Sequence, residues 1–379
     1  MRKAFMWMRL VCLALVIASA SLEQAWAVEA VFVAEGSAPH APQQPQLAID
    51  GTGVIHLTYA QGDDVLYTAS RDEGRTFRKA VKLPPAHDIS LGMRRGPRIA
   101  VTKDVICISV IGGRKGKGRD GDLLSFRSTD GGETWEGPVT VNDEPDAARE
   151  GLHAMASGGD GSICCVWLDL RNRGTEIRAA LSKDGGATWS GNTLVYRSPS
   201  GSVCECCHPS VHLAADGQIS VLFRNALEGN RDMYVISSKD GGMSFGEASK
   251  VGTGTWPLKA CPMDGGCLAH LQDGRIATAW RRDRSIFFAA SPSYRETDLG
   301  SGEQPWITAT AHGTAVVWLT KRGGVLKYWS AAAEGSQDVA KAANDPVIAA
   351  GGKNNSLVAV AWESTEGPRT RIACAVMPR

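Results

Sequence analysis

Short segments in which apolar residues alternate with polar ones recur along most of this chain. Each is followed by a turn containing Asp or Gly and then by a second, more hydrophobic segment. Alternation with a period of two is typical of β-strands that have one buried face. The first strand of each unit is expected at 45–49, 97–101, 152–156, 209–213, 266–271, 305–309 and 346–350. The pattern therefore predicts an all-β chain made of seven similar units.

A sequence motif recurs at one turn in four of these units. The form Ser-x-Asp-Gly-Gly-x-Thr/Ser-Trp/Phe occupies 128–135, 182–189 and 238–245, and a looser copy occupies 70–77. An Asp carboxylate can accept hydrogen bonds from the backbone of its own turn, and glycines tolerate a positive φ. We therefore predict tight hairpin turns built on Asp72, Asp130, Asp184 and Asp240.

This motif resembles the Asp-box, or BNR, repeat of the sialidase-like β-propeller superfamily. The copies begin at 70, 128, 182 and 238, which is 58, 54 and 56 residues apart, and repeats of about 40 to 50 residues or more are typical of propeller blades. The resemblance implies a β-propeller of four-stranded antiparallel blades with Asp-box turns, and the seven units predict seven blades. The last two units have no Asp box, so a six-bladed, sialidase-type propeller is the alternative.

The two ends of the chain make separate predictions. Residues 1–27 have the basic start, the short apolar run and the Ala-x-Ala site of a signal peptide, with cleavage after Ala27. We therefore expect a periplasmic or secreted protein, with 28–379 forming a single propeller domain and no later apolar run long enough to span a membrane. The last unit has no room for an outer strand, so we expect 28–33 to close the last blade.

Charge is balanced over the whole chain but not along it. There are 41 Lys and Arg against 40 Asp and Glu, a net charge of +1, which argues against nucleic-acid binding. Loops predicted at one mouth of the propeller are rich in arginine, whose planar fork suits carboxylate, sulfate or phosphate. A small anionic ligand is therefore predicted there, although solvated or ion-paired arginines are the alternative. The candidates are Arg171, Arg224, Arg281, Arg282 and Arg322.

Cysteines are the feature that the resemblance does not imply. Of the ten, Cys12 lies in the signal peptide, and five of the other nine fall in two segments that lead into consecutive inner strands. We expect these segments to meet near the same mouth. The candidates for a disulfide or metal site are Cys204, Cys206, Cys207, His208, Cys261, Met263 and Cys267. Disulfides suit an exported protein, whereas thiolate, thioether and imidazole donors suit copper or zinc. The form Cys204-x-x-Cys207-His208 also matches a haem c attachment motif.

Two classes of function follow from these residues. The first is a non-catalytic exported protein whose Arg- and Cys-rich mouth binds a small anion or a soft metal ion. The second, implied by the resemblance, is an exo-sialidase-type glycoside hydrolase acting on a terminal acidic sugar. The Arg-Ile-Pro sequence of sialidases is missing, and Tyr294 with Glu296 nearby is the one candidate nucleophilic pair. A propeller that binds a protein partner is a third possibility, with no specific motif behind it.

Overall fold

The computed structural model describes residues 28–116 and 119–378, so the predicted signal peptide lies outside the described residues. These residues form 27 β-strands and one short 3₁₀ helix, Lys353–Asn355. In the described part of the chain, no helix is long and apolar enough to cross a membrane. The prediction of an all-β chain is therefore confirmed.

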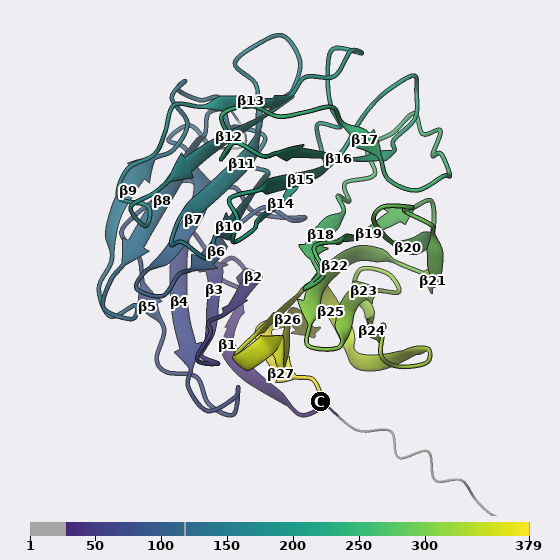
Figure 1. Cartoon of the computed structure of the whole chain (residues 1–379). Helices are drawn as coiled ribbons and strands as arrows, with labels where there is room; N and C mark the ends of the chain where they lie inside the picture. The colour runs from purple at the N-terminus through teal and green to yellow at the C-terminus, as the bar shows by residue number, and fades with distance from the viewer. Residues whose placement is uncertain (1–27, 117–118, 379) are drawn as a thin grey trace, which may run out of the picture.

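Five antiparallel sheets of four strands follow one another around a ring in chain order (Figure 1). The first contains β2 (Pro42–Ile49), β3 (Ile55–Gln61), β4 (Asp64–Ser70) and β5 (Val81–Lys82). The second contains β6 (Arg98–Val101), β7 (Ile106–Gly112), β8 (Asp122–Ser128) and β9 (Glu136–Thr140). The third contains β10 (His153–Ser157), β11 (Ile163–Asp169), β12 (Glu176–Ser182) and β13 (Thr193–Tyr196). The fourth contains β14 (Ser210–Leu213), β15 (Ile219–Arg224), β16 (Met233–Ser238) and β17 (Ser249–Lys250). The fifth contains β18 (Cys267–His270), β19 (Ile276–Arg282), β20 (Ser285–Ala290) and β21 (Thr297–Ser301).

The remaining strands form one sheet of seven, in the order β1-β27-β26-β25-β24-β23-β22. They are β1 (Ala30–Ser37), β22 (Glu303–Thr310), β23 (Gly313–Leu319), β24 (Gly324–Ser330), β25 (Ser336–Gly351), β26 (Leu357–Glu366) and β27 (Arg369–Val376).

The prediction of seven four-stranded blades is wrong, and so is the six-bladed alternative. The propeller has five blades of four strands, and the rest of the chain is the seven-stranded sheet. The error lies in β25, whose first half pairs with β24 and whose second half pairs with β26. Pro346 suggested a new strand, but it lies at a bulge between Asn344 and Val347, where a strand tolerates the missing N–H. The strand therefore continues, and no gap separates two sheets.

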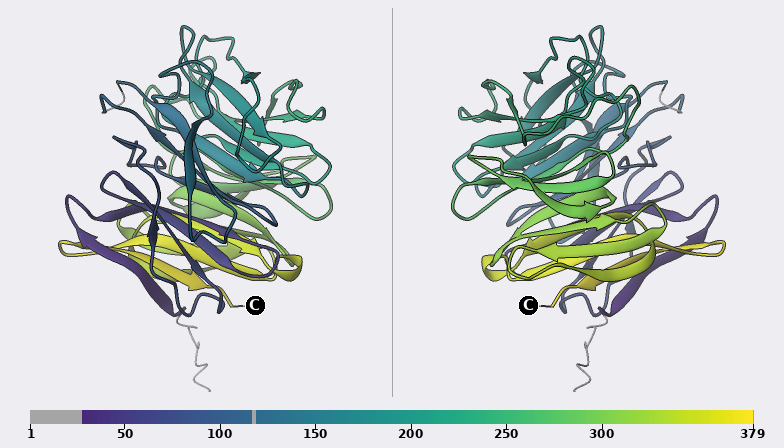
Figure 2. Two further views of the ribbon diagram at one scale, coloured as in Figure 1. Left: turned by 90° about the vertical axis from the view of Figure 1, so that its left-hand side faces the viewer. Right: turned by 90° about the vertical axis from the view of Figure 1, so that its right-hand side faces the viewer.

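The N-terminal strand closes the last sheet, as predicted. β1 pairs antiparallel with β27 from Ala30 opposite Ala375 to Ser37 opposite Arg369. Figure 2 shows from two sides that the first strand, in purple, lies beside the last strands, in yellow. Glu35 reinforces the pairing through Arg369 at 3.1 Å and Arg371 at 2.6 Å. The two ends of the described chain are thus held in one sheet.

All four Asp-box turns form where they were predicted, between the third and fourth strands of the first four sheets. In the turn of Asp130, the carboxylate accepts hydrogen bonds from the Thr134 N–H at 3.0 Å and the Ser128 hydroxyl at 2.8 Å. Asp72, Asp184 and Asp240 make the equivalent contacts. The aromatic residue of a turn packs on the preceding sheet: Trp135 meets Tyr67 edge-on, with ring centroids 5.1 Å apart. The boxes therefore join neighbouring sheets.

The sheets pack through their inner strands and through buried side chains between neighbours. Contacts run from β2 to β6, β10, β14, β18 and β22, and through β25 back to β2. The segments before β6, β10, β14 and β18 will be called the lead-in loops: 83–97, 141–152, 197–209 and 251–266. Arg224, at the end of β15, bonds the carbonyls of Asp264 and Arg281. The lead-in loops and the ends of the second strands therefore share one mouth of the propeller, as predicted.

Candidate functional site

A lead-in loop meets the first residue of β18 near the axis, at His208 and Cys267. The His208 Nε2 atom lies 3.7 Å from the Cys267 Sγ atom, and the imidazole stacks on Trp306 with ring centroids 5.6 Å apart. A Cβ atom added to Gly265 would lie 2.3 Å from the His208 carbonyl oxygen, so only glycine fits between the loops. The predicted convergence of the two cysteine-containing segments is therefore present.

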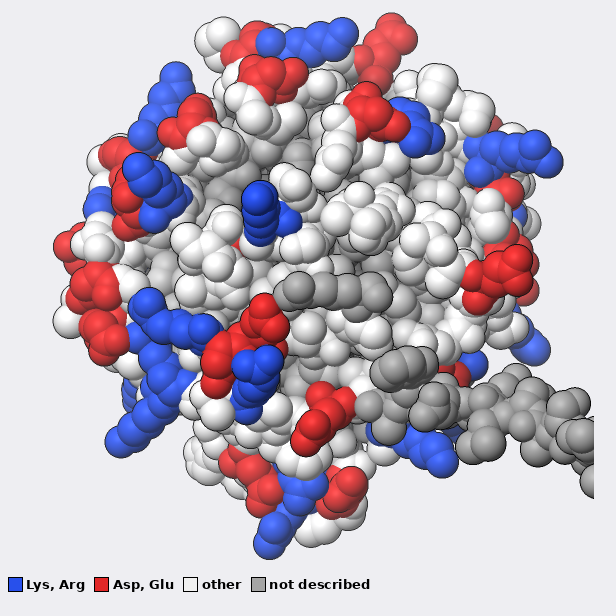
Figure 3. All heavy atoms as spheres, turned by 60° about the horizontal axis from the view of Figure 1, so that its bottom comes forward, with Lys and Arg blue, Asp and Glu red and all other residues white. Residues whose placement is uncertain are grey.

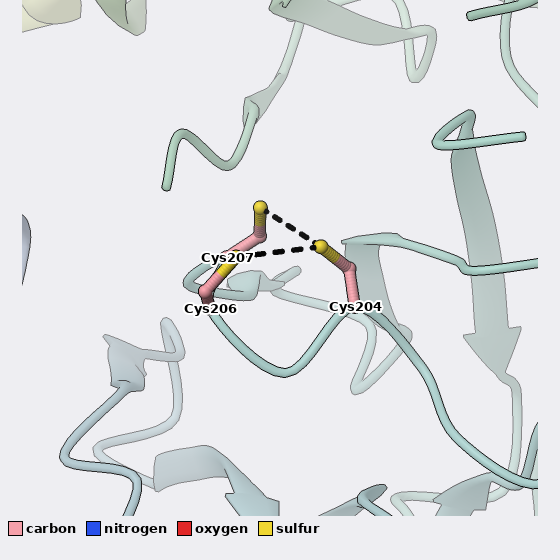
Figure 4. A group of neighbouring side chains, drawn as sticks. All are labelled: Cys204, Cys206 and Cys207. Carbon is pink, nitrogen blue, oxygen red and sulfur yellow. Dashed lines mark hydrogen bonds between the residues drawn. The ribbon is translucent and has the colours of Figure 1, made fainter. Parts of the chain in front are cut away.

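A compact thiol cluster lies on the lead-in loop that contains His208 (Figure 4). The Sγ atom of Cys204 is 3.2 Å from that of Cys207 and 3.8 Å from that of Cys206. All three sulfur atoms lie within 4.8 Å of one another. Cys204 and Cys207 are buried, and Cys206 is partly exposed. The cluster thus has two buried thiols and one that solvent can reach.

Electrostatics favour ionisation at one of these thiols. Hydrogen bonds with the Cys206 and Cys207 thiols lower the pKa of Cys204, and the nearby Arg224 and Arg231 guanidinium groups lower it further, while burial opposes them. Burial raises the pKa of Cys207. A thiolate is the metal-binding form of cysteine, and the lowered pKa of Cys204 favours that form.

The other predicted sulfur ligands lie outside this cluster. Cys261 is exposed, Met263 is partly buried, and Cys267 contacts His208. No disulfide joins any of the nine cysteines that the structure describes.

A haem c does not suit this motif. Cys204, Cys207 and His208 are each at most 2% exposed. The His208 ring is covered on one face by Trp306. No open face is left for a porphyrin among these described residues.

The five predicted arginines are all engaged within the protein. Arg171 contacts Asp169 at 2.9 Å and Asp143 at 2.7 Å, and Arg282 holds Glu296 at 2.6 and 2.8 Å. Arg224 is buried and donates to three backbone carbonyls.

The remaining two contact acidic residues near the axis. Arg281 lies 3.3 Å from Glu303, and Arg322 lies 3.7 Å from Asp345. Four of the five predicted arginines are therefore ion-paired, as the alternative interpretation expected, and Arg224 is the exception.

Tyr294 and Glu296 do not form a catalytic pair at the axis. Tyr294 packs beside Trp280 and Phe287 in the fifth sheet. The paired Arg282 lowers the pKa of Glu296, whose carboxylate also accepts from the Thr253 N–H at 2.9 Å. This carboxylate supports a loop at the outer part of the sheet.

A buried polar network fills the axis, and the sequence analysis missed it. Arg94 donates to the carbonyl oxygens of Pro346 at 2.7 Å and Gln304 at 2.5 Å. The Gln304 N–H donates to Asp264 Oδ2 at 2.7 Å, and the Gln304 side-chain amide contacts Asp345 at 3.2 Å. The polar residue before an inner-strand proline was the available signal, since Gln304 and Asp345 both hold that position.

Charged side chains of both signs are mixed over the face shown in Figure 3, mainly toward its edge. This mixture matches the balanced composition. It gives no continuous surface of one sign on that face for a large charged partner.

The comparisons with known proteins agree with the fold. Residues 99–285 match the family model of the BNR repeat-like domain, which confirms the predicted resemblance to sialidase-like BNR propellers. No curated protein matches the chain.

Three solved structures illustrate the likeness, which at these identities shows the fold alone. An alpha-L-arabinanase from Penicillium chrysogenum, complexed with arabinobiose, is 13% identical with a TM-score of 0.55; the match covers 92% of this chain and 97% of that one. An ulvan lyase of polysaccharide lyase family PL25 is 10% identical with a TM-score of 0.56, covering 91% and 95%. The Hadza microbial sialidase Hz136 is 13% identical with a TM-score of 0.52, covering 89% and 65%.

Proposed function

We propose that the chain is an exported, non-catalytic propeller that binds a soft metal ion at Cys204, Cys206 and Cys207. The observation that carries the proposal is the approach of three sulfur atoms to within 4.8 Å of one another. A metal–sulfur bond of about 2.3 Å requires sulfur atoms about 3.8 to 4.0 Å apart in trigonal or tetrahedral coordination. The distances of 3.2 and 3.8 Å from Cys204 need only small adjustment.

The number of donors favours Cu(I) over Zn²⁺. Structural zinc sites have four protein ligands almost without exception, whereas soft thiolates also select Cu(I). Among the described residues, no His, Asp or Glu joins the three thiols in the cluster. The positive Arg224 and Arg231 near Cys204 offset the charge of several thiolates around a monovalent ion.

Glycoside hydrolysis has less support. It requires two positioned carboxyl groups that reach a sugar, or the Tyr/Glu pair of a sialidase. The axial carboxyl groups of Asp264, Asp345 and Glu363 are 1%, 3% and 9% exposed and are held by Gln304 and Gln44. Glu296 is occupied by Arg282.

The test is a Cu(I) titration of the reduced, purified protein under anaerobic conditions, in competition with a chromophoric Cu(I) chelator. We expect one tightly bound ion per chain and loss of this binding in Cys204→Ser and Cys206→Ser. The matched control is Cys261→Ser, which removes an exposed thiol outside the cluster and should bind as the wild type does.

Two results would overturn the proposal. One is a wild type that does not compete for Cu(I) once its thiols are shown to be reduced. The other is equal loss of binding in Cys261→Ser and Cys204→Ser. A Cys204–Cys207 disulfide in the isolated protein, with no metal uptake after reduction, would favour the disulfide interpretation instead.

A further inference from the structure

A cavity lies at the same mouth, between the first two lead-in loops. Its volume is about 520 Å³, and its polar lining comes from Asp88, Ser90, Arg95, Arg149 and Glu150. The loops are 83–97 and 141–152, which lead into the neighbouring inner strands β6 and β10. Cavities of about 300 to 1,000 Å³ are the usual size for small-molecule sites.

Two guanidinium groups in this cavity keep free donors. Arg95 donates from Nε to the Glu150 carbonyl at 2.9 Å, and Arg149 donates from one Nη to the Asp146 carbonyl at 3.1 Å. Among the described residues, neither has a carboxylate within 4.0 Å, in contrast to Arg171 and Arg282. Both arginines are thus positioned by backbone oxygens, with the remaining N–H groups available to a ligand.

A hydroxyl group and a glycine complete one wall. Ser90 and Arg95 both lie against Gly151, where an added Cβ would lie 2.8 Å from Ser90 Cβ and 2.9 Å from Arg95 Cδ. Gly151 has φ of 76°, which other residues rarely adopt. The Ser90 hydroxyl has no hydrogen-bond partner among the described residues. Glycine therefore leaves room for both side chains at this point of the wall.

The acidic residues of the cavity supply hydrogen-bond acceptors. Burial raises the pKa of Glu150, and the Glu205 carboxylate of the thiol-bearing loop raises it further, while Arg95 and Arg149 oppose the shift. Asp88 lies on the exposed side. Two arginines beside two carboxyl groups suit a ligand that has both a carboxylate and several hydroxyl groups, because each kind of group then has a partner.

We infer that this cavity binds a small hydroxylated organic carboxylate, with Arg95 and Arg149 holding the carboxylate and Ser90, Asp88 and Glu150 contacting the hydroxyl groups. The site is separate from the thiol cluster and needs no metal ion. It also differs from the five arginines that the sequence suggested, because it uses guanidinium groups without carboxylate partners.

Calorimetric titration with three probes tests the inference on the metal-free protein. Gluconate has the carboxylate and the hydroxyl groups, sorbitol lacks the carboxylate, and acetate lacks the hydroxyl groups. We expect gluconate to bind and the other two to bind more weakly by about tenfold or more, the usual effect of losing a charge-assisted hydrogen bond.

Variants assign the binding to the cavity. Arg95→Gln and Arg149→Gln should each weaken gluconate binding by about tenfold. Arg173→Gln, which alters an exposed arginine outside the cavity, should leave it unchanged. Arg95→Lys and Arg149→Lys keep the charge and serve if either Gln variant does not fold, which circular dichroism would show.

The inference is overturned if gluconate does not bind at millimolar concentration, if sorbitol binds equally well, or if Arg173→Gln weakens binding as much as the cavity variants. Equal binding of acetate and gluconate would remove the role assigned to the hydroxyl groups. Gluconate binding that survives Cys204→Ser, together with loss of Cu(I) binding in that variant, would separate the two sites.

Discussion

The imidazole Nε2 of His208 lies 3.7 Å from the Cys267 sulfur, across 59 positions of sequence. Burial lowers the pKa of His208 well below its usual value, with Arg94, Arg98 and Arg224 adding to the effect, so the ring is neutral. Stacked on Trp306, the ring joins the starts of β14, β18 and β22. We therefore expect the histidine next to the thiol cluster to support the loop and not to bind the proposed metal ion.

This support leads to a first prediction. His208→Ala should lower the free energy of unfolding by about 2 to 4 kcal/mol, as for other large buried side chains. The variant should nevertheless take up one Cu(I) ion, because its three thiols are intact. Chemical denaturation and Cu(I) titration measure the two quantities. Retained stability with lost Cu(I) binding would instead make His208 a ligand.

The axial carboxyl groups predict a pH dependence of stability. Burial raises the pKa of Asp264 to about 6 from an ordinary value of 3.8, so folding favours its protonated form. The stabilisation is complete below the ordinary value and is lost as pH rises through about 6. We expect Tm to fall between pH 4 and pH 7, with at most about 3 kcal/mol from this group.

Asp264→Asn should flatten this part of the curve, because the amide stays neutral and its oxygen can still accept from the Gln304 N–H. Burial also raises the pKa of Glu363, to about 7, so part of the slope should remain. Thermal unfolding followed at several pH values gives the comparison. An unchanged slope in Asp264→Asn would contradict the assignment.

An Asp-box carboxylate predicts the opposite dependence at acid pH. Hydrogen bonds from Thr188 lower the pKa of Asp184 to about 2. Its stabilisation is therefore present above about 4 and lost as pH falls toward 2. Asp184→Asn should lower Tm at pH 7 and reduce the loss of Tm on acidification. The control is Asp104→Asn, an exposed change outside the Asp boxes, which should alter neither the Tm at pH 7 nor its loss on acidification.

Removal of β1 is expected to destabilise the propeller as a whole. A chain starting after Ser37 loses the strand that pairs with β27 and the Glu35 contacts with Arg369 and Arg371. One cooperative unfolding transition at a lower temperature is expected in calorimetry. Glu35→Gln, which removes only exposed ion pairs, should shift Tm little. Equal Tm values for the truncated and intact chains would show that the closure is not stabilising.

Absence of sialidase turnover is the last prediction. With Glu296 held by Arg282 and the axial carboxyl groups buried, the purified protein should not release the leaving group of a fluorogenic sialoside. A sialidase of known activity provides the positive control. Turnover in the wild type that Tyr294→Phe abolishes would refute the non-catalytic proposal.

Much of the fold could be predicted because its determinants are local. The four Asp boxes each contain the donors and the acceptor of their own turn, as Asp130 does with Ser128 and Thr134. The path of β25 could not be predicted from Pro346, since Pro45 in β2 and Pro305 in β22 lie at similar bulges. Of these three strands, only β25 pairs with one neighbour before the bulge and with another after it. Whether a proline interrupts a strand depends on which neighbour it faces.

The site was predicted less well because most of its contacts join residues that are distant in sequence. The three clustered thiols lie within four residues and could be grouped by sequence, whereas Cys261 could not be placed. The partners of Arg171 and Arg282, Asp143 and Glu296, are 28 and 14 residues away. Arg95 and Arg149 stood out by lacking such partners, which becomes visible only once the loops are folded.

The long strand β25 also limits how this propeller can be rearranged. Each four-stranded sheet is a separate hydrogen-bonded unit, so one such unit could be exchanged for that of a relative at its loops. From Glu303 to Val376 no such boundary exists, because β25 bonds to strands on either side. A domain inserted near Asn344 would break both halves of the sheet together. The first part of the chain is modular, and the last behaves as a single block that also carries β1.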